Sequence, residues 1–239
     1  MKYLVILYLG IFLCSSFSCK SESKPKVLVF TKTAGFHHSS IPAGVAAIIK
    51  LGAEHNFDVD TTSNADLFTS ANLNKYAAVV FLSTTGDLLN QQQEADFKKY
   101  IQSGHGYMGI HGAADAEYDW AWYNKLVGAY FDSHPEQQMA TLNVVDKSNI
   151  ATKHLPEKWN RKDEWYNFKQ INTDLHVLLT IDETSYKGGK NGTNHPMAWY
   201  HDFDGGRSFY TELGHTDESY ADPLFLKHIL GGLQYAIGK

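Results

Sequence analysis

The sequence predicts a single α/β domain of three layers, with a mainly parallel central sheet and an antiparallel extension. In the first half of the chain, short and uniformly apolar runs alternate with segments of helical periodicity, as in parallel strands buried on both faces. In the second half, strand-like runs follow one another more directly. The last two of these runs flank Asp204-Gly205-Gly206, a turn sequence typical of a β-hairpin.

The first half contains the parallel strands and their helices. Its four predicted strands are the apolar runs Lys26–Thr31, Phe57–Thr61, Ala77–Leu82 and Gly106–His111. A helix is predicted to begin at Ile41-Pro42, because Ser39 or Ser40 offers a hydroxyl cap and proline suits the first turn. Further helices are predicted at Asn90–Ile101 and Asp119–Val127.

The second half supplies the extension and the last helix. Its predicted strands are Met139–Val145, His176–Ile181, Met197–His201 and Arg207–Leu213. Asp222-Pro223 opens a final helix whose apolar positions continue to Ile237. In sheets of this kind ligands bind beyond the carboxyl ends of the strands, so functional residues are expected in the loops that follow the strands.

Residues 1–18 have the three parts of a secretion signal. Lys2 is the basic start, and the apolar stretch Tyr3–Leu13 is shorter than the ~20 residues that span a bilayer. Ser16-Phe17-Ser18 precedes Cys19 as in a degenerate lipobox, which predicts Cys19 as the lipidated first residue of an exported lipoprotein. Residues 19–25 would then tether a domain at 26–239 to the membrane, in the periplasm or at the outer membrane. The alternative is a cleaved signal without a lipid.

Composition excludes several classes of chemistry. The chain's only cysteines are Cys14 and Cys19, so the predicted domain has no disulfide, no thiolate metal ligand and no cysteine nucleophile. The formal net charge is -5 and there is no basic run, so nucleic acid is not expected as a partner. Membrane contact is expected only through the lipid. Aromatic residues make up 13% of the chain and several stand beside polar motifs, which indicates a ring-shaped ligand.

The segment 106–115, GYMGIHGAAD, has a nucleophile turn without a nucleophile. Glycines allow a sharp turn after a strand and expose one side chain above the sheet. Hydrolases and amidotransferases have Ser or Cys at this position, whereas this chain has His111. An imidazole there suits proton transfer, metal ligation or hydrogen bonding to a substrate better than acyl-enzyme chemistry.

Other candidate residues lie in predicted loops. The chain has twelve histidines, and four of them join His111 as candidates for holding a substrate or a metal: His38, His134, His195 and His215. Glu164 stands beside Trp165, and bulky aromatic neighbours are expected to raise its pKa and suit it to acid or base catalysis. Three histidines and one carboxylate from separate loops could bind Zn, Mn or Fe, although no short metal motif is present. The candidate ligands are His111, His134, His215 and Glu164.

Aromatic and acidic residues are interleaved after His111. Asp115, Glu117, Tyr118 and Trp120 resemble a sugar-binding wall, in which flat rings cover the C–H faces of a sugar and carboxylates accept its hydroxyl hydrogen bonds. The alternative is an amphipathic helix whose rings fill the core.

Several blocks in order resemble one family over nearly the whole predicted domain. They are Thr33-Ala34-Gly35-Phe36 with His38, Leu82-Ser83-Thr84-Thr85-Gly86-Asp87, Gly109-Ile110-His111, Gly128-Ala129-Tyr130-Phe131 with His134-Pro135, Asp163-Glu164-Trp165-Tyr166, His195-Pro196 and Gly214-His215-Thr216. Together they are similar to the ThuA-like family, named for trehalose utilisation. Family members commonly have Arg where this chain has His37, so the resemblance assigns a role to His38 only.

The resemblance implies a flavodoxin-like fold of the class I glutamine-amidotransferase-like type, without the catalytic cysteine and without amidotransferase activity. It also implies sugar catabolism, particularly of 3-keto-glycosides that a partner oxidoreductase produces.

Three functions remain open from the sequence. The first is an exported carbohydrate-active enzyme that acts on keto-sugars, with His111 and Glu164 as the proton-transfer pair. The remaining candidates would bind the substrate: His38, Asp115, Glu117, Tyr118, Trp120, His134, His195 and His215. The second is a conventional glycoside hydrolase that pairs Glu164 with an aspartate from 115–119. The third is a non-catalytic sugar-binding lipoprotein.

Overall fold

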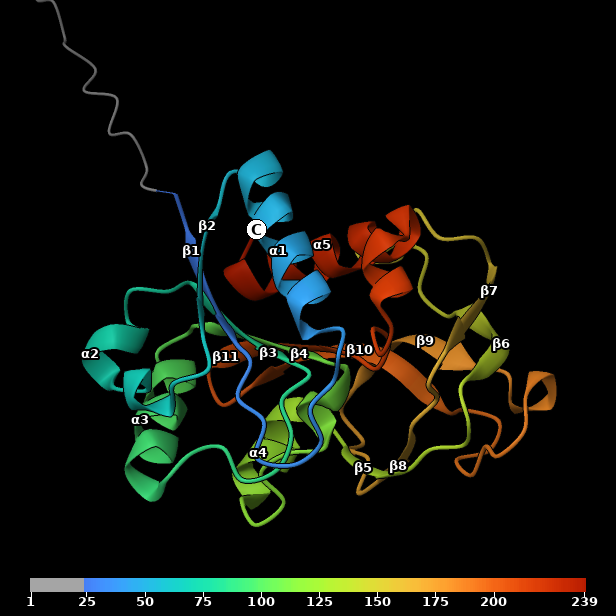
Figure 1. Ribbon diagram of the computed structural model, residues 1–239, viewed down its shortest axis with the longest axis horizontal. Helices are drawn as coiled ribbons and strands as arrows, with labels where there is room; N and C mark the ends of the chain where they lie inside the picture. Colours follow the sequence, from blue (N-terminus) through green and yellow to red (C-terminus); the bar gives the residue numbers. More distant parts are fainter. Residues whose placement is uncertain (1–23) are drawn as a thin grey trace, which may run out of the picture.

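The computed structural model describes residues 24–239 (Figure 1). The predicted signal at 1–18, the predicted lipid site Cys19 and most of the tether lie outside the described residues. Within 24–239, no helix has the length and apolar character needed to cross a membrane. The first strand begins at Lys26, where the domain is predicted to start.

Within the described residues, nine strands form one sheet in the order β2-β1-β3-β4-β11-β10-β9-β6-β7. The strands are β1 (Lys26–Phe30), β2 (Asp58–Thr62), β3 (Ala78–Leu82), β4 (Gly106–Ile110), β6 (Gln138–Val144), β7 (Lys158–Asp163), β9 (His176–Ile181), β10 (Pro196–Phe203) and β11 (Gly206–Thr211). The pairs from β2 to β11 are parallel, and every later pair is antiparallel. The parallel sheet with an antiparallel extension is therefore confirmed.

Three segments form strands that the sequence pattern did not predict. β5 (Tyr130–Ser133) and β8 (Asn167–Lys169) make a separate two-stranded antiparallel sheet. β7 is the edge strand of the large sheet, and its buried positions alternate with exposed ones. Because two of its inward side chains are polar, this alternation is not visible as an apolar pattern.

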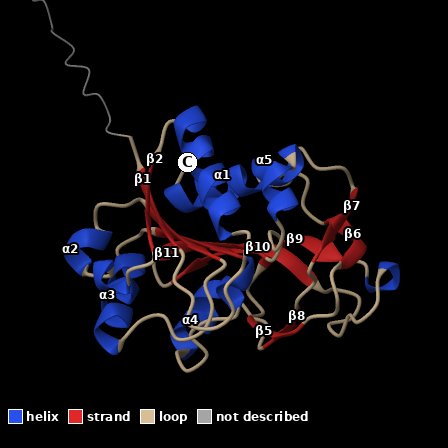
Figure 2. Cartoon of the chain, viewed as in Figure 1, coloured by secondary structure: helices blue, strands red, loops and turns tan. Residues whose placement is uncertain are grey.

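Helices cover both faces of the sheet, which completes the three layers. Figure 1 shows α1 (Ile41–His55) and α5 (Pro223–Ile237) on one side, with α3 (Gln91–Gln102) and α4 (Ala121–Val127) on the other. The short α2 (Ser70–Leu73) packs against α3. Figure 2 shows the strands running between these helix layers, with the antiparallel strands at the far end from α3.

The helix starts follow their capping residues. The Asn90 side chain accepts the N–H groups of Gln92 and Gln93 at the start of α3, and the Asp222 side chain accepts the N–H of Leu224 at the start of α5. At α1 the predicted hydroxyl cap is wrong, because Ser40 donates its hydroxyl to the carbonyl of Gly214 instead. That bond ties the start of α1 to the loop after β11.

The core continues on both faces of the sheet. β3 is buried at every position, and its Phe81 contacts Phe30 on one neighbouring strand and Phe97 on α3. In the extension, Trp199 and Tyr210 pack ring against ring across β10 and β11. Each such buried side chain contributes about 1.5–3 kcal/mol to folding. The strand ends, and the loops that follow them, are held by this core.

Candidate functional site

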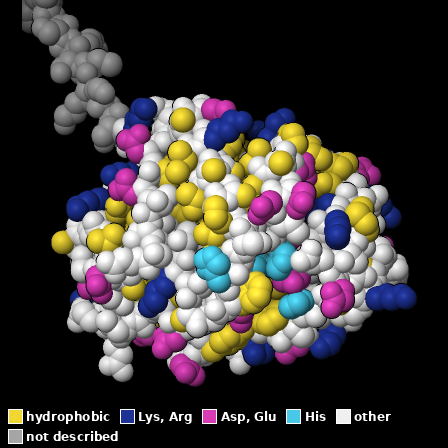
Figure 3. Space-filling view, viewed as in Figure 1, with side chains coloured by type: hydrophobic (Ala, Val, Ile, Leu, Met, Phe, Trp, Pro, Cys, Tyr) yellow, Lys and Arg dark blue, Asp and Glu magenta, His cyan; other side chains and the backbone are white. Residues whose placement is uncertain are grey.

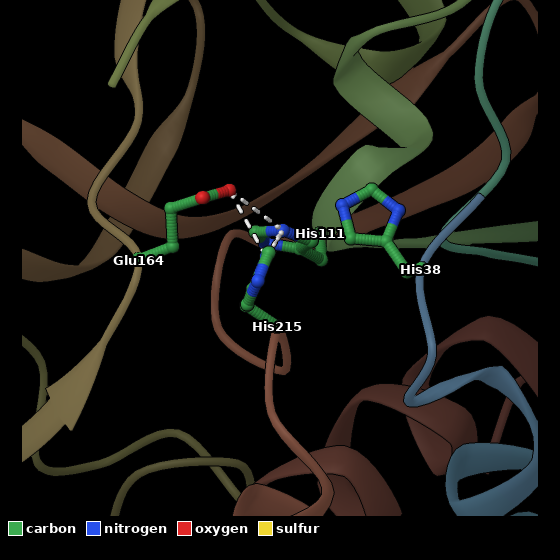
Figure 4. Close-up of side chains that lie close together, drawn as sticks. All are labelled: His38, His111, Glu164 and His215. Atoms are coloured by element: carbon green, nitrogen blue, oxygen red, sulfur yellow. Dashed lines mark hydrogen bonds and ion pairs between the residues drawn. The ribbon is translucent and has the colours of Figure 1, made fainter. Parts of the chain in front are cut away.

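Four side chains from four loops meet at one edge of the sheet (Figure 4). They are His38 after β1, His111 after β4, Glu164 after β7 and His215 after β11. Each offers one ligand atom, and these atoms all lie within 4.8 Å of one another. We call these four residues the cluster.

The topology explains why a residue from β7 reaches the other three. Four successive antiparallel pairings separate β11 from β7, so β7 runs in the same direction as β11 and the parallel strands. Its carboxyl end therefore lies on the same side as theirs. The Asp163 carboxylate at that end accepts the N–H of Gly214 at 3.1 Å, which shows that the extension curls back toward the end of β11.

His111 occupies the tight turn that the sequence predicts. Its φ is +50°, an uncommon conformation for a residue with a side chain, directly after β4. A Cβ on Gly112 would lie 3.1 Å from the Thr84 carbonyl oxygen and 3.2 Å from the His38 ring, so the following position favours glycine. The Tyr210 hydroxyl donates to the His111 carbonyl at 2.8 Å and fixes the turn.

The hydrogen bonds of His111 select its tautomer. Nδ1 lies 2.6 Å from the backbone carbonyl oxygen of Glu212, which can only accept a hydrogen bond, so Nδ1 carries the proton. Nε2 then has its lone pair directed into the cluster, 3.0 Å from Nδ1 of His215 and 3.4 Å from Oε2 of Glu164. A carbonyl that orients the far nitrogen is typical of metal-binding histidines.

The cluster combines a neutral His38 imidazole with one ionised carboxylate. Burial, together with the neighbouring His111 and His215, lowers the pKa of His38 to about 3. For Glu164, burial raises the pKa, but contacts from His111 and His215 outweigh burial and hold the pKa well below its usual value. The prediction of a raised pKa for Glu164 is therefore wrong. Its aromatic neighbours in sequence matter less than the two histidines that the fold brings to it.

The donor set fits a divalent transition metal. A tetrahedral ion with bonds of about 2.0–2.2 Å needs donor atoms roughly 3.3–3.6 Å apart. The three pairs among His111, Glu164 and His215 are 3.0–3.4 Å apart, so small shifts give that geometry. Figure 4 shows the His38 ring with one nitrogen turned toward the other three. The other ring nitrogen, Nδ1, lies on the side away from the cluster and is buried without a partner among residues 24–239. Imidazole nitrogens with a carboxylate suit Zn, Mn or Fe.

The predicted ligand set and the cluster differ at one residue. His111, Glu164 and His215 belong to both, but His38 lies in the cluster where His134 was predicted. His134 is half-exposed, and its Nδ1 lies 3.2 Å from Oε1 of Glu164, on the other carboxylate oxygen from the one that faces His111. It therefore contacts Glu164 from outside the cluster.

A cavity of about 390 Å³ opens above the cluster. Its walls are formed by Phe36, His38, Asp115, Phe131, His134, Gln137, Glu164, Tyr166 and His215. His111 is fully buried and is not among the lining residues. Figure 3 shows histidine side chains grouped on this face beside an apolar strip. The size lies within the range of about 300–1,000 Å³ for small-molecule sites, and rings beside polar groups suit a sugar.

The predicted substrate-binding residues that follow His111 are divided between two neighbouring cavities. Asp115 lines the cavity above the cluster, whereas Glu117, Tyr118 and Trp120 line a neighbouring cavity of about 520 Å³. The Tyr118 hydroxyl donates to Asp115 at 2.6 Å and so joins the two walls. Burial raises the pKa of Asp115.

The structure does not bring His195 to either of these cavities. This residue is fully buried, and its Nε2 lies 2.7 Å from the Tyr166 carbonyl oxygen while Nδ1 lies 2.9 Å from Glu183. It holds the backbone of a cavity wall, because Tyr166 lines the cavity above the cluster. A direct contact with substrate is not supported by this position.

Glu212 is a site residue that the sequence pattern does not indicate. Its backbone carbonyl orients His111, and its side-chain Oε1 accepts the N–H of Tyr166 at 3.0 Å. Burial raises the pKa of this carboxyl well above its usual value. The apolar pattern around β11 predicted a core strand through this position and gave no sign that its polar residue contacts both His111 and Tyr166.

Glu117 should make stability depend on pH. Its side chain is nearly buried and accepts the N–H groups of Leu88 and Leu89, yet burial raises its pKa to about 7. Because the folded pKa exceeds the unfolded value of 4.5, its contribution is greatest below pH 4.5 and is lost as the pH rises to 7. The loss is on the order of 3 kcal/mol. Urea unfolding across this range should show a shallower pH dependence for Glu117→Gln.

Glu136→Gln is the control for that experiment, because Glu136 is an exposed carboxylate. It should keep the pH dependence of the wild type. Equal slopes for the wild type and Glu117→Gln would contradict the prediction.

Comparisons with known proteins give consistent results. A family model described as "Trehalose utilisation", ThuA, matches residues 26–236. The fold is similar to that of a ThuA-like protein from Bacteroides uniformis ATCC 8492, with a TM-score of 0.76, 20% identity, and coverage of 93% of this chain and 96% of that one. For a ThuA-like protein from Parabacteroides merdae ATCC 43184, the TM-score is 0.75 and the identity is 22%, with coverage of 90% of this chain and 91% of that one. No curated protein matches the chain. At these identities the solved structures establish the shared fold.

Proposed function

The chain belongs to the ThuA family, and from this membership and the cluster we propose that it is a carbohydrate-active enzyme of sugar catabolism that acts on keto-sugars such as 3-keto-glycosides. The observation that carries the proposal is the convergence of three histidines and one carboxylate at a cavity with aromatic walls. A sugar with a ketone requires prior oxidation, which a partner oxidoreductase would perform. The predicted signal and Cys19 make the protein an exported lipoprotein in this proposal.

The cluster would hold a divalent ion, Zn, Mn or Fe. A bound ion polarises the substrate carbonyl and stabilises negative charge on its oxygen. This proposal gives His111 and Glu164 the role of ligands in place of direct proton transfer. His111 has both nitrogens engaged and does not line the cavity, and Glu164 contacts two cluster histidines.

Asp115 and His134 would then exchange protons with the substrate, because they line the cavity without being ligands. One of them removes the proton from the carbon between the ketone and the anomeric carbon. The electron pair of that C–H bond forms a carbon–carbon double bond while the glycosidic C–O bond breaks. The departing oxygen keeps the electrons of its bond and takes a proton from the other group. Later addition of water to the double bond makes the net reaction a hydrolysis. Each positioned acid or base contributes about 10²–10⁴-fold to the rate.

The first test follows a 3-keto-glucoside and its unoxidised parent by NMR in D₂O, with and without added Zn²⁺ or Mn²⁺. Deuterium that enters beside the ketone, with cleavage of the keto form only, is the expected result. Cleavage of the parent alone would favour a conventional hydrolase that pairs Glu164 with Asp115, since both line the cavity. Binding of either sugar without reaction would favour the non-catalytic sugar-binding protein.

A further inference from the structure

Asp163 is a buried carboxylate at the end of β7 that contacts the backbone of two cluster residues. Its Oδ1 accepts the N–H of Glu164 and the N–H of His215, each at 3.1 Å. Its Oδ2 accepts the N–H of Gly214, also at 3.1 Å. One side chain thus holds the backbone at two of the four candidate ligands, although it does not itself face the cavity.

The charge of Asp163 is compensated from the other side. Nη2 of Arg161 lies 2.9 Å from Oδ2, and the guanidinium lies over the rings of Trp159 and Phe225. The Ser219 hydroxyl donates to the same oxygen at 3.1 Å. A buried carboxylate with five hydrogen bonds and a fixed counter-charge has few alternative positions.

We propose that Asp163 is the positioning residue of the cluster: it aligns Glu164 and His215 so that their donor atoms meet His111 at ion-binding distance. The alignment matters because Glu164 and His215 come from loops far apart in sequence, and no hydrogen bond between their backbones is present among residues 24–239. Asp163 supplies that connection. The inference rests on the proposed function only in its claim that the cluster binds an ion.

The test replaces Asp163 by Asn, which has nearly the same shape. Asn keeps one acceptor oxygen and presents an NH₂ group on the other side, where N–H donors already point. With the NH₂ group in the place of Oδ1, the hydrogen bonds from Glu164 and His215 are lost. With the NH₂ group in the place of Oδ2, the hydrogen bonds from Gly214 and Arg161 are lost. Loss of an outer partner typically weakens metal affinity by about 10–100-fold. We expect that loss for Co²⁺, followed by its visible absorption on binding to the intact protein.

A second readout needs no metal. In the metal-free wild type, the amides of Gly214 and His215 should exchange slowly with D₂O, because Asp163 accepts both. In Asp163→Asn at least one of these two amides should exchange at least 10-fold faster, since Asn keeps a single acceptor oxygen. Fast exchange of these amides in the wild type, or no change in the variant, would overturn the inference. This measurement remains decisive if the variant does not fold, because the wild-type result alone contradicts or supports the proposed hydrogen bonds.

Asp222→Ala separates positioning from general loss of stability. Asp222 caps α5 and lies 3.7 Å from Arg161, so it belongs to the same network without contacting a cluster residue's backbone. It should lower the unfolding temperature and leave Co²⁺ affinity unchanged. Equal weakening of Co²⁺ binding in both variants would refute a positioning role for Asp163. A wild type that binds no Co²⁺ but shows the protected amides would refute the metal centre and leave the alignment by Asp163 intact.

Discussion

Under the proposed function, Glu164→Gln should reduce turnover of a 3-keto-glycoside by at least about 10²-fold and prevent binding of the proposed ion, since loss of even an outer partner of a metal site costs about 10–100-fold. Oε2 of Glu164 lies 3.4 Å from Nε2 of His111 and 3.0 Å from Nδ1 of His215, and it is the only carboxylate in the cluster. Gln has the same size but carries no charge, so the fold should persist while the donor set loses its anion. Turnover and the metal content of the purified variant measure the two effects together.

His111→Ala should have the same outcome, because His111 lies at the base of the cluster. His37→Ala is the matched control. His37 is exposed next to His38 in sequence, and its Nδ1 bonds only to the Thr33 hydroxyl. It should keep both the ion and the activity of the wild type. Full turnover in Glu164→Gln or His111→Ala would show that the chemistry takes place elsewhere.

Gly106→Ala should lower the free energy of unfolding by about 3 kcal/mol or more. A Cβ at this position, the first residue of β4, would lie 1.9 Å from the carbonyl oxygen of Ala236 and 2.6 Å from its carbonyl carbon. Both atoms belong to the backbone of α5, so no flexible side chain can move aside. The helix itself must shift from the sheet, and overpacking of this kind costs about 1–3 kcal/mol, and occasionally more. Denaturant unfolding of the two proteins measures the difference.

Gly104→Ala is the control for steric clash. Gly104 has φ +91°, so alanine there is strained, but the nearest atom to its Cβ would be the Gly205 carbonyl oxygen at 3.9 Å. The strain alone should cost about 1–2 kcal/mol. If Gly106→Ala were no more destabilising than Gly104→Ala, close packing of α5 on β4 would not be the reason for the glycine.

The strands and the longer helices of the parallel half could be predicted, because local signals and tertiary burial agree there, whereas the short α2 was not predicted. β3 is an uninterrupted apolar run, and α3 begins at a capping box formed by Asn90 and Gln93. β7 could not be predicted in the same way. Its inward positions are Trp159, Arg161 and Asp163, and two of these three are charged. Arg161 and Asp163 can be buried because their opposite charges compensate each other. A hydrophobic pattern does not reveal such a pair.

The candidate site was predictable in its chemistry but not in its contacts. Residue type and loop position identified His111, Glu164 and His215, and only His111 and His215 follow strands that the sequence predicts. The choice between His38 and His134 as the fourth member depends on distances between loops, which sequence spacing does not contain. The same limit explains the pKa of Glu164. Its sequence neighbours predicted a raised value, whereas histidines distant in sequence lower it.

The curled extension also affects how the chain completes its fold. His111 and His215 are 104 residues apart, and closing so long a loop is slow and entropically costly, although the cost grows only gradually with length. A partly folded chain with only its parallel strands formed would present His38, His111 and His215 without Glu164. Tight capture of an ion requires all four loops, so an ion at the cluster would bind the finished fold in preference to any intermediate. By mass action, the stability of the folded protein would then increase as the free metal concentration rises.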